Sequence, residues 1–278
     1  MKKYITSIIM TLGVLITLSV LLYPTLADYV NSRNQSRVIA GYREEVANID
    51  DGKKQEILEA ARQYNARMWC RPGYSDFTEK EIEEYKKLLD TGSGIMGILT
   101  IDKIGVNLPI YHSTDEGVLQ VGIGHMQGSH LPIGGPNTHA IITGHRGLPS
   151  SKLLTDLDKL VEGDVFTLYI LGDTLTYQVD HIAIVEPHEL SALSVEDGRD
   201  FCTLVTCTPY GVNTHRLLVR GTRIENIESA VREAIFADAV KLDKITIILM
   251  FIMPLLPVLL VYFVIKCVKI YKGRRIHR

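Results

Sequence analysis

Two long apolar runs lie near the ends of the chain, on either side of a region of mixed polarity. The first extends from Tyr4 to Tyr23, follows Lys2 and Lys3, and is stopped by Pro24. The second extends from Ile245 to Ile265 and contains no charged residue. Because a helix needs about 20 apolar residues to cross a bilayer, we expect two transmembrane helices.

The charges beside these runs predict their orientation. A basic tail follows the second run and consists of Lys266, Lys269, Lys272, Arg274, Arg275 and Arg278. Since basic flanks stay on the cytoplasmic side, we expect both termini in the cytoplasm and residues 28–243 outside the cell. A cleaved signal peptide has the same basic-then-apolar order, and Thr25, Leu26 and Ala27 leave that alternative open. No clear small-x-small cleavage site follows the run, so we favour an uncleaved anchor in a multi-pass membrane protein.

The stretch from Tyr29 to about Asp90 has a helical pattern. Charged and apolar residues interleave there at spacings of three and four. Arg71-Pro72-Gly73 breaks the pattern, and Thr78, three residues before Glu81, fits a capping box. We therefore expect a second helical segment over Glu79 to Leu89.

After this point the pattern changes to short apolar segments separated by turn residues, which is typical of a β-sandwich or barrel. The expected strands are Ile95–Ile101, Val106–Tyr111, Ala140–Thr143, Val165–Ile170, Thr174–Val185, Phe201–Cys207 and His215–Gly221. The stretch His130 to Asn137 is rich in Gly and Pro and is expected to be a loop. One short helix is expected over Ser151 to Leu160.

These patterns divide the chain into six expected segments. They are a cytoplasmic tip and membrane anchor (1–28), a helical segment with a predicted lid (29–93), a catalytic β-domain (94–225), a linker (226–243), a transmembrane helix (244–266) and a basic cytoplasmic tail (267–278).

Composition excludes several classes of function. The chain has 30 Lys and Arg against 32 Asp and Glu, so it has no general affinity for nucleic acid. Its four cysteines, at positions 70, 202, 207 and 267, form no CxxC pair and no zinc-like spacing. No cluster of acidic residues indicates calcium. We therefore predict no metal and no cofactor.

The segment from Phe201 to Gly221 holds the first candidate catalytic residues. Two apolar strands flank a connection that contains Pro209 and Gly211, and this arrangement reads as a hairpin. Cys207 and Arg216 are nearly symmetric about the turn, so antiparallel pairing would place them side by side. A guanidinium there could favour the reactive thiolate, or could bind the oxyanion that forms when a carbonyl is attacked.

A third candidate follows the strand that ends at Thr143. His145 stands between Gly144 and Arg146-Gly147, which leaves room for a substrate beside its imidazole. Histidine can protonate a leaving amine and later deprotonate an incoming one. Each residue alone also has a plain structural reading, because a cysteine at a strand end is usually a small core residue.

The motifs around these residues resemble the signature of the sortase family. They are Thr203-Leu-Val-Thr-Cys207, Arg216 after Asn213-Thr-His215, and Thr143-Gly-His145-Arg-Gly147. The resemblance covers about Ile95 to Ile224 and includes Gly122-Ile-Gly-His125 and Leu131-Pro-Ile-Gly-Gly135. The Cys207 to Gly221 segment and the second apolar run look like class C, the pilin polymerases.

This resemblance implies a closed β-barrel outside a Gram-positive cell. Cys207 would attack the Thr–Gly bond of an LPXTG-like sorting signal in a pilin or surface protein. A lysine amine of the next pilin would release the thioester as an isopeptide. His145 would act as acid and base, and Arg216 would bind the substrate and the oxyanion.

The resemblance also directs attention to three further residues. Thr206 precedes the nucleophile and could position it, or could simply be a β-branched strand residue. Class C sortases commonly carry an Asp-Pro-aromatic lid, but this chain has only Ser75-Asp76-Phe77 in the corresponding stretch. Asp76 could pair with Arg216 while Phe77 covers Cys207, or Asp76 could be a surface acid before a helix. Cys70 could make a redox contact with Cys207.

Three alternative functions remain open. A sortase could anchor surface proteins or finished pili to cell-wall peptide with the same catalytic residues. An exported cysteine peptidase or L,D-transpeptidase also combines Cys and His, but the latter usually has a His-Gly-Cys context where this chain has Thr206 before Cys207. A non-catalytic membrane-tethered scaffold would tolerate loss of Cys207.

Overall fold

The computed structural model describes residues 2–69 and 77–226. Within this part of the chain, residues 30–226 belong to one compact unit and residues 2–29 to another. Asp76, Cys70 and the second predicted membrane span therefore lie outside the described residues.

Four α-helices precede or interrupt the sheet. They are α1 (Lys2–Asn48), α2 (Asp51–Trp69), α3 (Glu79–Tyr85) and α4 (Glu116–Leu119). Pro24, which follows the first apolar run, lies inside α1. A proline removes one backbone donor, which a long helix can tolerate locally. Within residues 2–69 and 77–226, no helix is long and apolar enough to span a membrane.

The capping box before α3 is present as predicted. The Glu81 backbone donates to Thr78 Oγ1 at 3.3 Å, and Glu81 Oε2 accepts from the Thr78 backbone at 2.8 Å. The helix ends at Tyr85 and not at Leu89, which adopts a left-handed backbone with φ of 60°. The predicted helix over Ser151 to Leu160 was also too long, because only a 3₁₀ turn, η2 (Leu157–Lys159), forms there.

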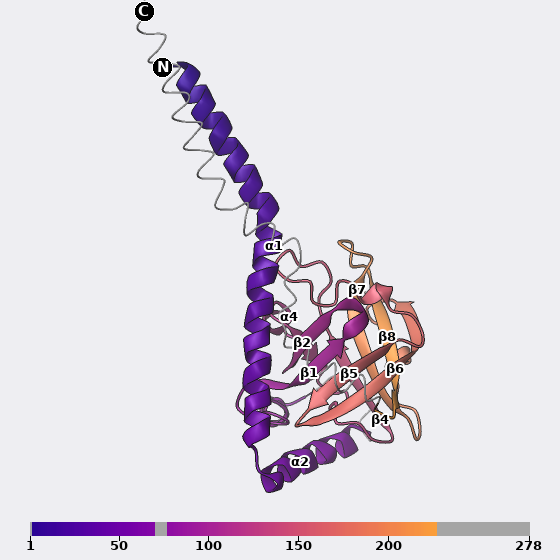
Figure 1. Ribbon diagram of the computed structural model, residues 1–278. Helices are drawn as coiled ribbons and strands as arrows, with labels where there is room; N and C mark the ends of the chain where they lie inside the picture. The colour runs from indigo at the N-terminus through magenta and orange to yellow at the C-terminus, as the bar shows by residue number, and fades with distance from the viewer. Residues whose placement is uncertain (1, 70–76, 227–278) are drawn as a thin grey trace, which may run out of the picture. The chain divides into compact units, whose positions relative to one another are not determined.

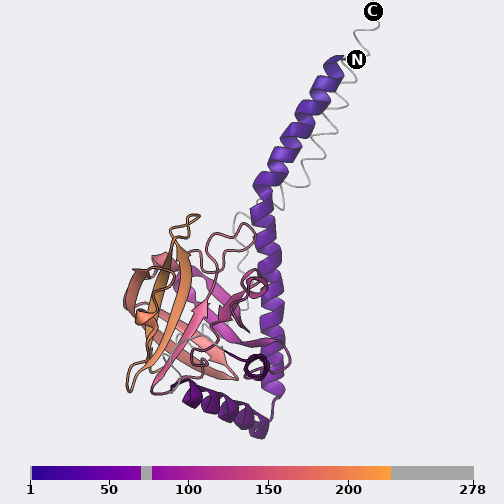
Figure 2. The same ribbon diagram turned by 180° about the vertical axis from the view of Figure 1, so that it is seen from behind.

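Eight strands close into a barrel in the order β1-β2-β3-β4-β7-β8-β6-β5 (Figures 1 and 2). The strands are β1 (Ile95–Ile101), β2 (Val106–His112), β3 (Ile123–His125), β4 (Thr138–Thr143), β5 (Val165–Ile170), β6 (Asp173–Val185), β7 (Asp200–Thr208) and β8 (His215–Ile224). Seven were predicted within a few residues. The short β3 was missed, because three residues carry too little alternation to be recognised.

Two pairs of neighbouring strands in the barrel are parallel. β2 pairs with β3, and β4 pairs with β7, while all other neighbours are antiparallel. The β4–β7 pair brings together segments that are far apart in the sequence. The candidate residues after β4 and at the end of β7 therefore meet at one end of the barrel.

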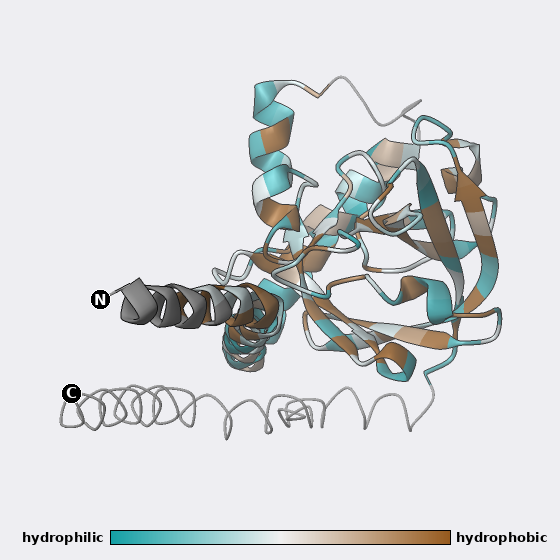
Figure 3. Ribbon diagram, turned by 90° about the horizontal axis from the view of Figure 1, so that it is seen from above, coloured by the Kyte–Doolittle hydropathy of each residue, from teal (hydrophilic) through white to brown (hydrophobic). Residues whose placement is uncertain are grey.

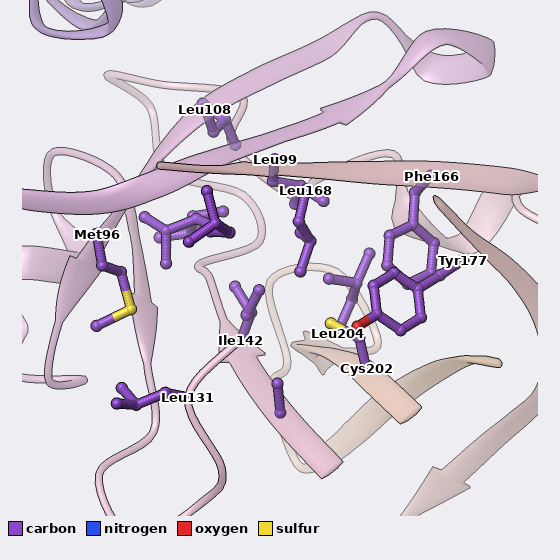
Figure 4. Packing of buried hydrophobic residues seen from close by; sticks show 14 of the residues in the cluster. Met96, Leu99, Leu108, Leu131, Ile142, Phe166, Leu168, Tyr177, Cys202 and Leu204 are labelled. Atoms are coloured by element: carbon purple, nitrogen blue, oxygen red, sulfur yellow. The ribbon is translucent and has the colours of Figure 1, made fainter. Parts of the chain in front are cut away.

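The barrel interior is filled by apolar side chains from all its strands. Figure 4 shows Leu99, Leu168, Ile142 and Leu204 converging on it, with Phe166 stacked on Tyr177. Gly221 leaves room for this stack, because a Cβ at that position would lie 2.6 Å from the Phe166 ring.

Residues 30–48 of α1 and helix α2 pack on the outside of the barrel (Figures 1 and 2). Ile39 and Tyr42 of α1 pack on Ile95 and Ile98 of β1. The Tyr42 hydroxyl donates to Met96 O at 3.1 Å. Helix α1 is thus attached to the barrel by apolar contact and by a buried hydrogen bond.

One side of helix α2 is buried. Figure 3 shows hydrophobic and hydrophilic residues interleaved along this helix. Its buried residues recur at spacings of three and four, as an amphipathic helix requires. Asn65 on this side exchanges two hydrogen bonds with the Leu131 backbone, at 3.2 and 2.7 Å. The helical segment expected before the β-domain therefore packs on the barrel.

Candidate active site

The register of β4 and β7 directs the segment that carries His145 toward the end of β7 that carries Cys207. The parallel ladder pairs Thr143 with Val205, and the Gly144 N–H then donates to Val205 O at 3.0 Å. The same register, extended two positions past the end of β4, would place the backbone of His145 level with Cys207.

The register of β7 and β8 supplies the third residue. Cys207 pairs with Arg216 and Thr208 pairs with His215, so the predicted hairpin is present. The Arg216 guanidinium donates through Nη1 to Asn213 O at 3.3 Å and to His215 O at 3.1 Å. These bonds hold the guanidinium against the backbone at the start of β8. Within the described residues no carboxylate forms an ion pair with Arg216.

The three residues share the face of the sheet that points away from the barrel interior. Cys202 and Leu204 belong to the interior cluster, whereas Val205 belongs to a separate cluster on the opposite face, with Ile141 and Leu218. Because side chains alternate along a strand, Cys207 lies on the same face as Val205. The site is therefore accessible from outside the barrel.

Burial distinguishes the two cysteines of β7. Cys202 is fully buried among apolar residues, and burial raises the pKa of its thiol far above the ordinary range. Cys207 is only half-buried and pairs across the ladder with Arg216. Since the thiolate is the reactive form, Cys207 is the cysteine suited to nucleophilic chemistry.

Thr206 has a definite structural function. Its side chain is 1% exposed and points inward, and its hydroxyl donates to Gly144 O at 2.8 Å. This bond ties the strand of the candidate nucleophile to the residue just before His145. Of the two sequence readings, positioning is the one that this contact favours.

Arg146 and Gly147 shape the wall next to His145. Arg146 donates through Nη1 to Thr208 Oγ1 at 3.0 Å and pairs with Asp158. Gly147 has a positive φ of 82°, and a Cβ there would lie 2.9 Å from the Tyr210 ring. The loop after β4 and the β7–β8 loop are therefore packed against each other around the site.

One neighbour of His145 was not predicted from the sequence. His145 Nε2 lies 3.5 Å from Oε1 of Glu116, the first residue of α4. Glu116 also accepts a hydrogen bond from Gln120 Nε2 at 2.5 Å. An isolated glutamate in a four-residue helix carries no sequence signal, and only the fold reveals this proximity.

The predicted lid residues are only partly visible. Phe77 is half-buried and packs against the interior apolar cluster. Asp76 and Cys70 lie outside the described residues. Among described residues, no group of three or more His, Cys, Asp or Glu side chains could hold a metal ion.

The other buried histidines are structural. Burial lowers the pKa of His125 to about 3 and that of His139 to about 4. His125 donates through Nε2 to His130 O at 2.8 Å, and Tyr85 Oη lies 2.9 Å from its Nδ1. Both rings are therefore neutral supports for the barrel and not acid–base groups.

Known protein families and solved structures match the part of the chain that contains this site. Residues 99–224 match the sortase domain family. A crystal structure of sortase C1 from Streptococcus agalactiae is 49% identical, with a TM-score of 0.66, and the match covers 69% of this chain and 100% of that chain. The chain belongs to the sortase family.

Further relatives agree with this assignment. Sortase C from Streptococcus pneumoniae is 40% identical to this sortase, with a TM-score of 0.63, over 68% of this chain and 97% of that chain. Sortase D of Bacillus subtilis (strain 168) is 26% identical over 190 residues, which are 67% of this chain and 92% of the relative. The resemblance to class C sortases is thus confirmed, and the chain is a cysteine transpeptidase.

Proposed function

We propose that this sortase polymerises pilins by cleaving an LPXTG-like sorting signal between Thr and Gly and joining the Thr to a lysine amine. The observation that carries the proposal is the pairing of Cys207 with Arg216 across β7 and β8, with His145 following the adjacent strand β4. The relatives provide the pilin context. One similar structure is described as sortase C1 of a pilus island, and another in terms of pilin substrate specificity.

In the first half of the reaction, the Cys207 thiolate attacks the threonine carbonyl carbon. A carbon–sulfur bond forms, and the tetrahedral intermediate then collapses with loss of the Thr–Gly carbon–nitrogen bond. The protonated His145 gives its proton to the leaving glycine amine. The product is a thioester on Cys207 and a free amine on the released peptide.

In the second half, a lysine amine of the next pilin attacks the thioester. The neutral His145 accepts a proton from this amine, and the carbon–sulfur bond breaks to restore the Cys207 thiolate. The new bond is an isopeptide. Because the same imidazole gives a proton and then takes one, the cycle leaves the enzyme unchanged.

Arg216 binds the sorting signal and stabilises the oxyanion. Its side chain comes from the residue paired with Cys207 and lies on the same face of the sheet, which supports a role for its positive charge in binding the oxyanion. Two backbone carbonyls hold the guanidinium in place before substrate arrives. Preorganised charge of this kind stabilises a transition state without reorganisation.

We also propose that the protein is held in the cell membrane with its catalytic domain outside the cell and both termini in the cytoplasm. The charge-free run from Ile245 to Ile265 and the basic tail after it support this arrangement. In the first apolar run, Leu12, Ile16, Val20 and Leu21 are all exposed on α1. Large apolar side chains that gather on one surface need an apolar environment.

The lid remains part of the proposal. Asp76 would pair with Arg216 and Phe77 would cover Cys207 in a resting state. In this structure Phe77 packs against the interior apolar cluster, so covering Cys207 requires Phe77 to leave that cluster. Replacing both residues with alanine should raise the initial rate if the lid closes the site, and leave it unchanged if it does not.

The choice of acceptor tests the polymerase proposal. Full-length protein in detergent micelles would be incubated with an LPXTG-type donor and two competing acceptors, a pilin bearing its lysine and a cell-wall peptide amine. Mass spectrometry of the joined products should show an isopeptide between pilins. Transfer to the wall peptide alone would make the enzyme an anchoring sortase. Equal function of Cys207→Ala would indicate a non-catalytic scaffold.

A further inference from the structure

The connection between β2 and β3 places a carboxylate against the candidate acid–base residue. β3 pairs with β4, and its Gly124 lies opposite Thr143, two residues before His145. α4 immediately precedes β3, so its first residue, Glu116, reaches the end of β4. The fold brings this side chain to the site independently of β7 and β8.

Gly124 makes this close approach feasible. A Cβ at this position would lie 2.0 Å from Ser113 O and 3.3 Å from a methyl group of Val118. Any larger residue would push the Ser113–Val118 segment away from β3. The glycine therefore lets the segment that carries Glu116 pack directly on the strand beside β4.

The contact itself involves an atom that lacks another partner. His145 Nε2 is inaccessible to solvent and has no hydrogen-bond partner among the described residues, although the side chain as a whole is 24% exposed. Glu116 Oε1 lies 3.5 Å away, which is within ion-pair reach but longer than a hydrogen bond. Catalytic hydrogen bonds are often long in free enzymes and shorten when substrate binds.

Glu116 is itself oriented. Gln120, one turn further along, donates to the same Oε1 atom. This hydrogen bond, together with attraction to His145, lowers the pKa of the Glu116 carboxyl, so the group is ionised at neutral pH. An ionised acceptor that faces an unpaired ring nitrogen is suited to stabilise the imidazolium form of the ring.

We propose that Glu116 is a positioning residue that holds the His145 ring and stabilises its protonated form during the transfer of a proton to the leaving amine. The inference rests on the acid–base role proposed above for His145. Glu116 touches neither substrate nor sulfur in this account. It acts only through Nε2 of His145, and Gln120 keeps its carboxylate in place.

The test compares Glu116→Gln, Glu116→Ala and Glu116→Asp in the full-length protein in detergent, with an LPXTG-type peptide as donor. Asp115→Asn is the matched control, because it removes one negative charge from the adjacent position. The Asp115 carboxylate accepts from Ser113 Oγ at 2.7 Å, and an asparagine oxygen can still accept that bond. The measured quantities are kcat, the KM for each substrate and the pH dependence of kcat/KM.

We expect Glu116→Gln and Glu116→Ala to lower kcat about tenfold, a part of the ~100-fold or more that acid–base catalysis provides. The KM for the donor should change little. In Glu116→Gln the high-pH limb of the pH–rate profile should move to lower pH, because the imidazolium loses a nearby negative charge. Glu116→Asp should restore the profile in part, and Asp115→Asn should match the unaltered protein.

Other outcomes would overturn the proposal. An unchanged kcat and pH profile in Glu116→Gln would show that the contact has no catalytic effect. A raised KM for the acceptor amine alone, with normal donor cleavage, would instead make Glu116 a binding site for the acceptor ammonium. His145→Ala distinguishes failure of the proposed function from failure of this inference. Full activity of His145→Ala would refute the proposed function. An inactive His145→Ala together with an unaffected Glu116→Gln would refute only the role of Glu116.

Discussion

Cys207 and Arg216 are paired residues on adjacent antiparallel strands, β7 and β8, and their side chains lie on the face of the sheet opposite the barrel interior. This relationship is fixed by backbone hydrogen bonds and not by a flexible loop. A nucleophile and a cation held in this way need no rearrangement to act together. The behaviour of variants at this site therefore depends on the pairing of β7 with β8 and on the residues that maintain it.

The two cysteines of β7 should differ in reactivity. Iodoacetamide should alkylate Cys207 while Cys202 remains unmodified in the folded protein, because Cys202 is fully buried and its pKa is raised by burial. Peptide mapping by mass spectrometry after brief exposure measures this directly. Equal labelling of both cysteines without unfolding would contradict the burial of Cys202.

Loss of the Thr206 hydroxyl should affect both stability and activity. Thr206→Val keeps the shape of the side chain but leaves Gly144 O without this buried donor, at a cost of about 1–3 kcal/mol in the free energy of unfolding. Because Gly144 precedes His145, turnover should also fall. Urea unfolding and peptide cleavage would be measured together. A matched control is Thr100→Val on β1, which removes a hydroxyl that donates to Asn107 Oδ1 and should leave turnover unchanged.

Arg146 should be sensitive even to replacement by lysine. Its guanidinium reaches Thr208 and Asp158 at once, and its side chain is only 10% exposed. A lysine ammonium is a single point charge and cannot reproduce this planar bridge. Arg146→Lys should lower turnover because it loosens the residue next to Cys207, whereas the same change at the exposed Arg199 should not. Equal activity of the two variants would refute the bridging role.

The buried histidines predict a dependence of stability on pH. The pKa values of His125 and His139 in the folded protein, about 3 and about 4, lie below the ordinary value of 6.5. Between these values the unfolded chain binds more protons than the folded one, so the free energy of unfolding should fall as pH drops below ~6.5. Each histidine contributes up to about 1.4 kcal/mol per pH unit.

The contribution of one histidine can be isolated. His139 donates through Nδ1 to Ser194 O at 2.9 Å and accepts through Nε2 from Thr203 Oγ1 at 2.7 Å, so it is held as a neutral ring. His139→Asn replaces it with a group that does not titrate. Urea unfolding at pH 7.5 and 5.0 should show a smaller loss of stability in the variant. An identical loss would mean that His139 is not held neutral.

Much of the barrel and the site could be predicted from the sequence, for physical reasons. Alternating apolar residues define β7 and β8, and their symmetry about Gly211 predicts the pairing of Cys207 with Arg216. The position of His145 depended on the family motif, because a parallel β4–β7 pair links distant segments and leaves no local signal. Glu116 could not be predicted, since its contact exists only after β3 has paired with β4.

Some helix boundaries were predicted wrongly because packing in the folded protein outweighed the local sequence pattern. The helix after Thr78 was expected to reach Leu89, but it ends at Tyr85. The segment from Ser151 to Leu160 has apolar residues at helical spacing, but these fill the space beside the loop after His145 with turns and one 3₁₀ segment. Packing against the barrel decided the conformation there, as tertiary contacts commonly override propensity.

The central claim is that Cys207 forms a thioester with a cleaved sorting signal. Full-length protein in detergent would be mixed with an LPXTG-type peptide, quenched in acid within seconds and measured by intact-mass spectrometry, followed by peptide mapping. The account predicts an added mass equal to the peptide up to its threonine, located on Cys207, present in Cys202→Ala and lost in Cys207→Ala. An adduct on another residue, or no adduct with Asp76 and Phe77 both replaced by alanine to open the predicted lid, would contradict it.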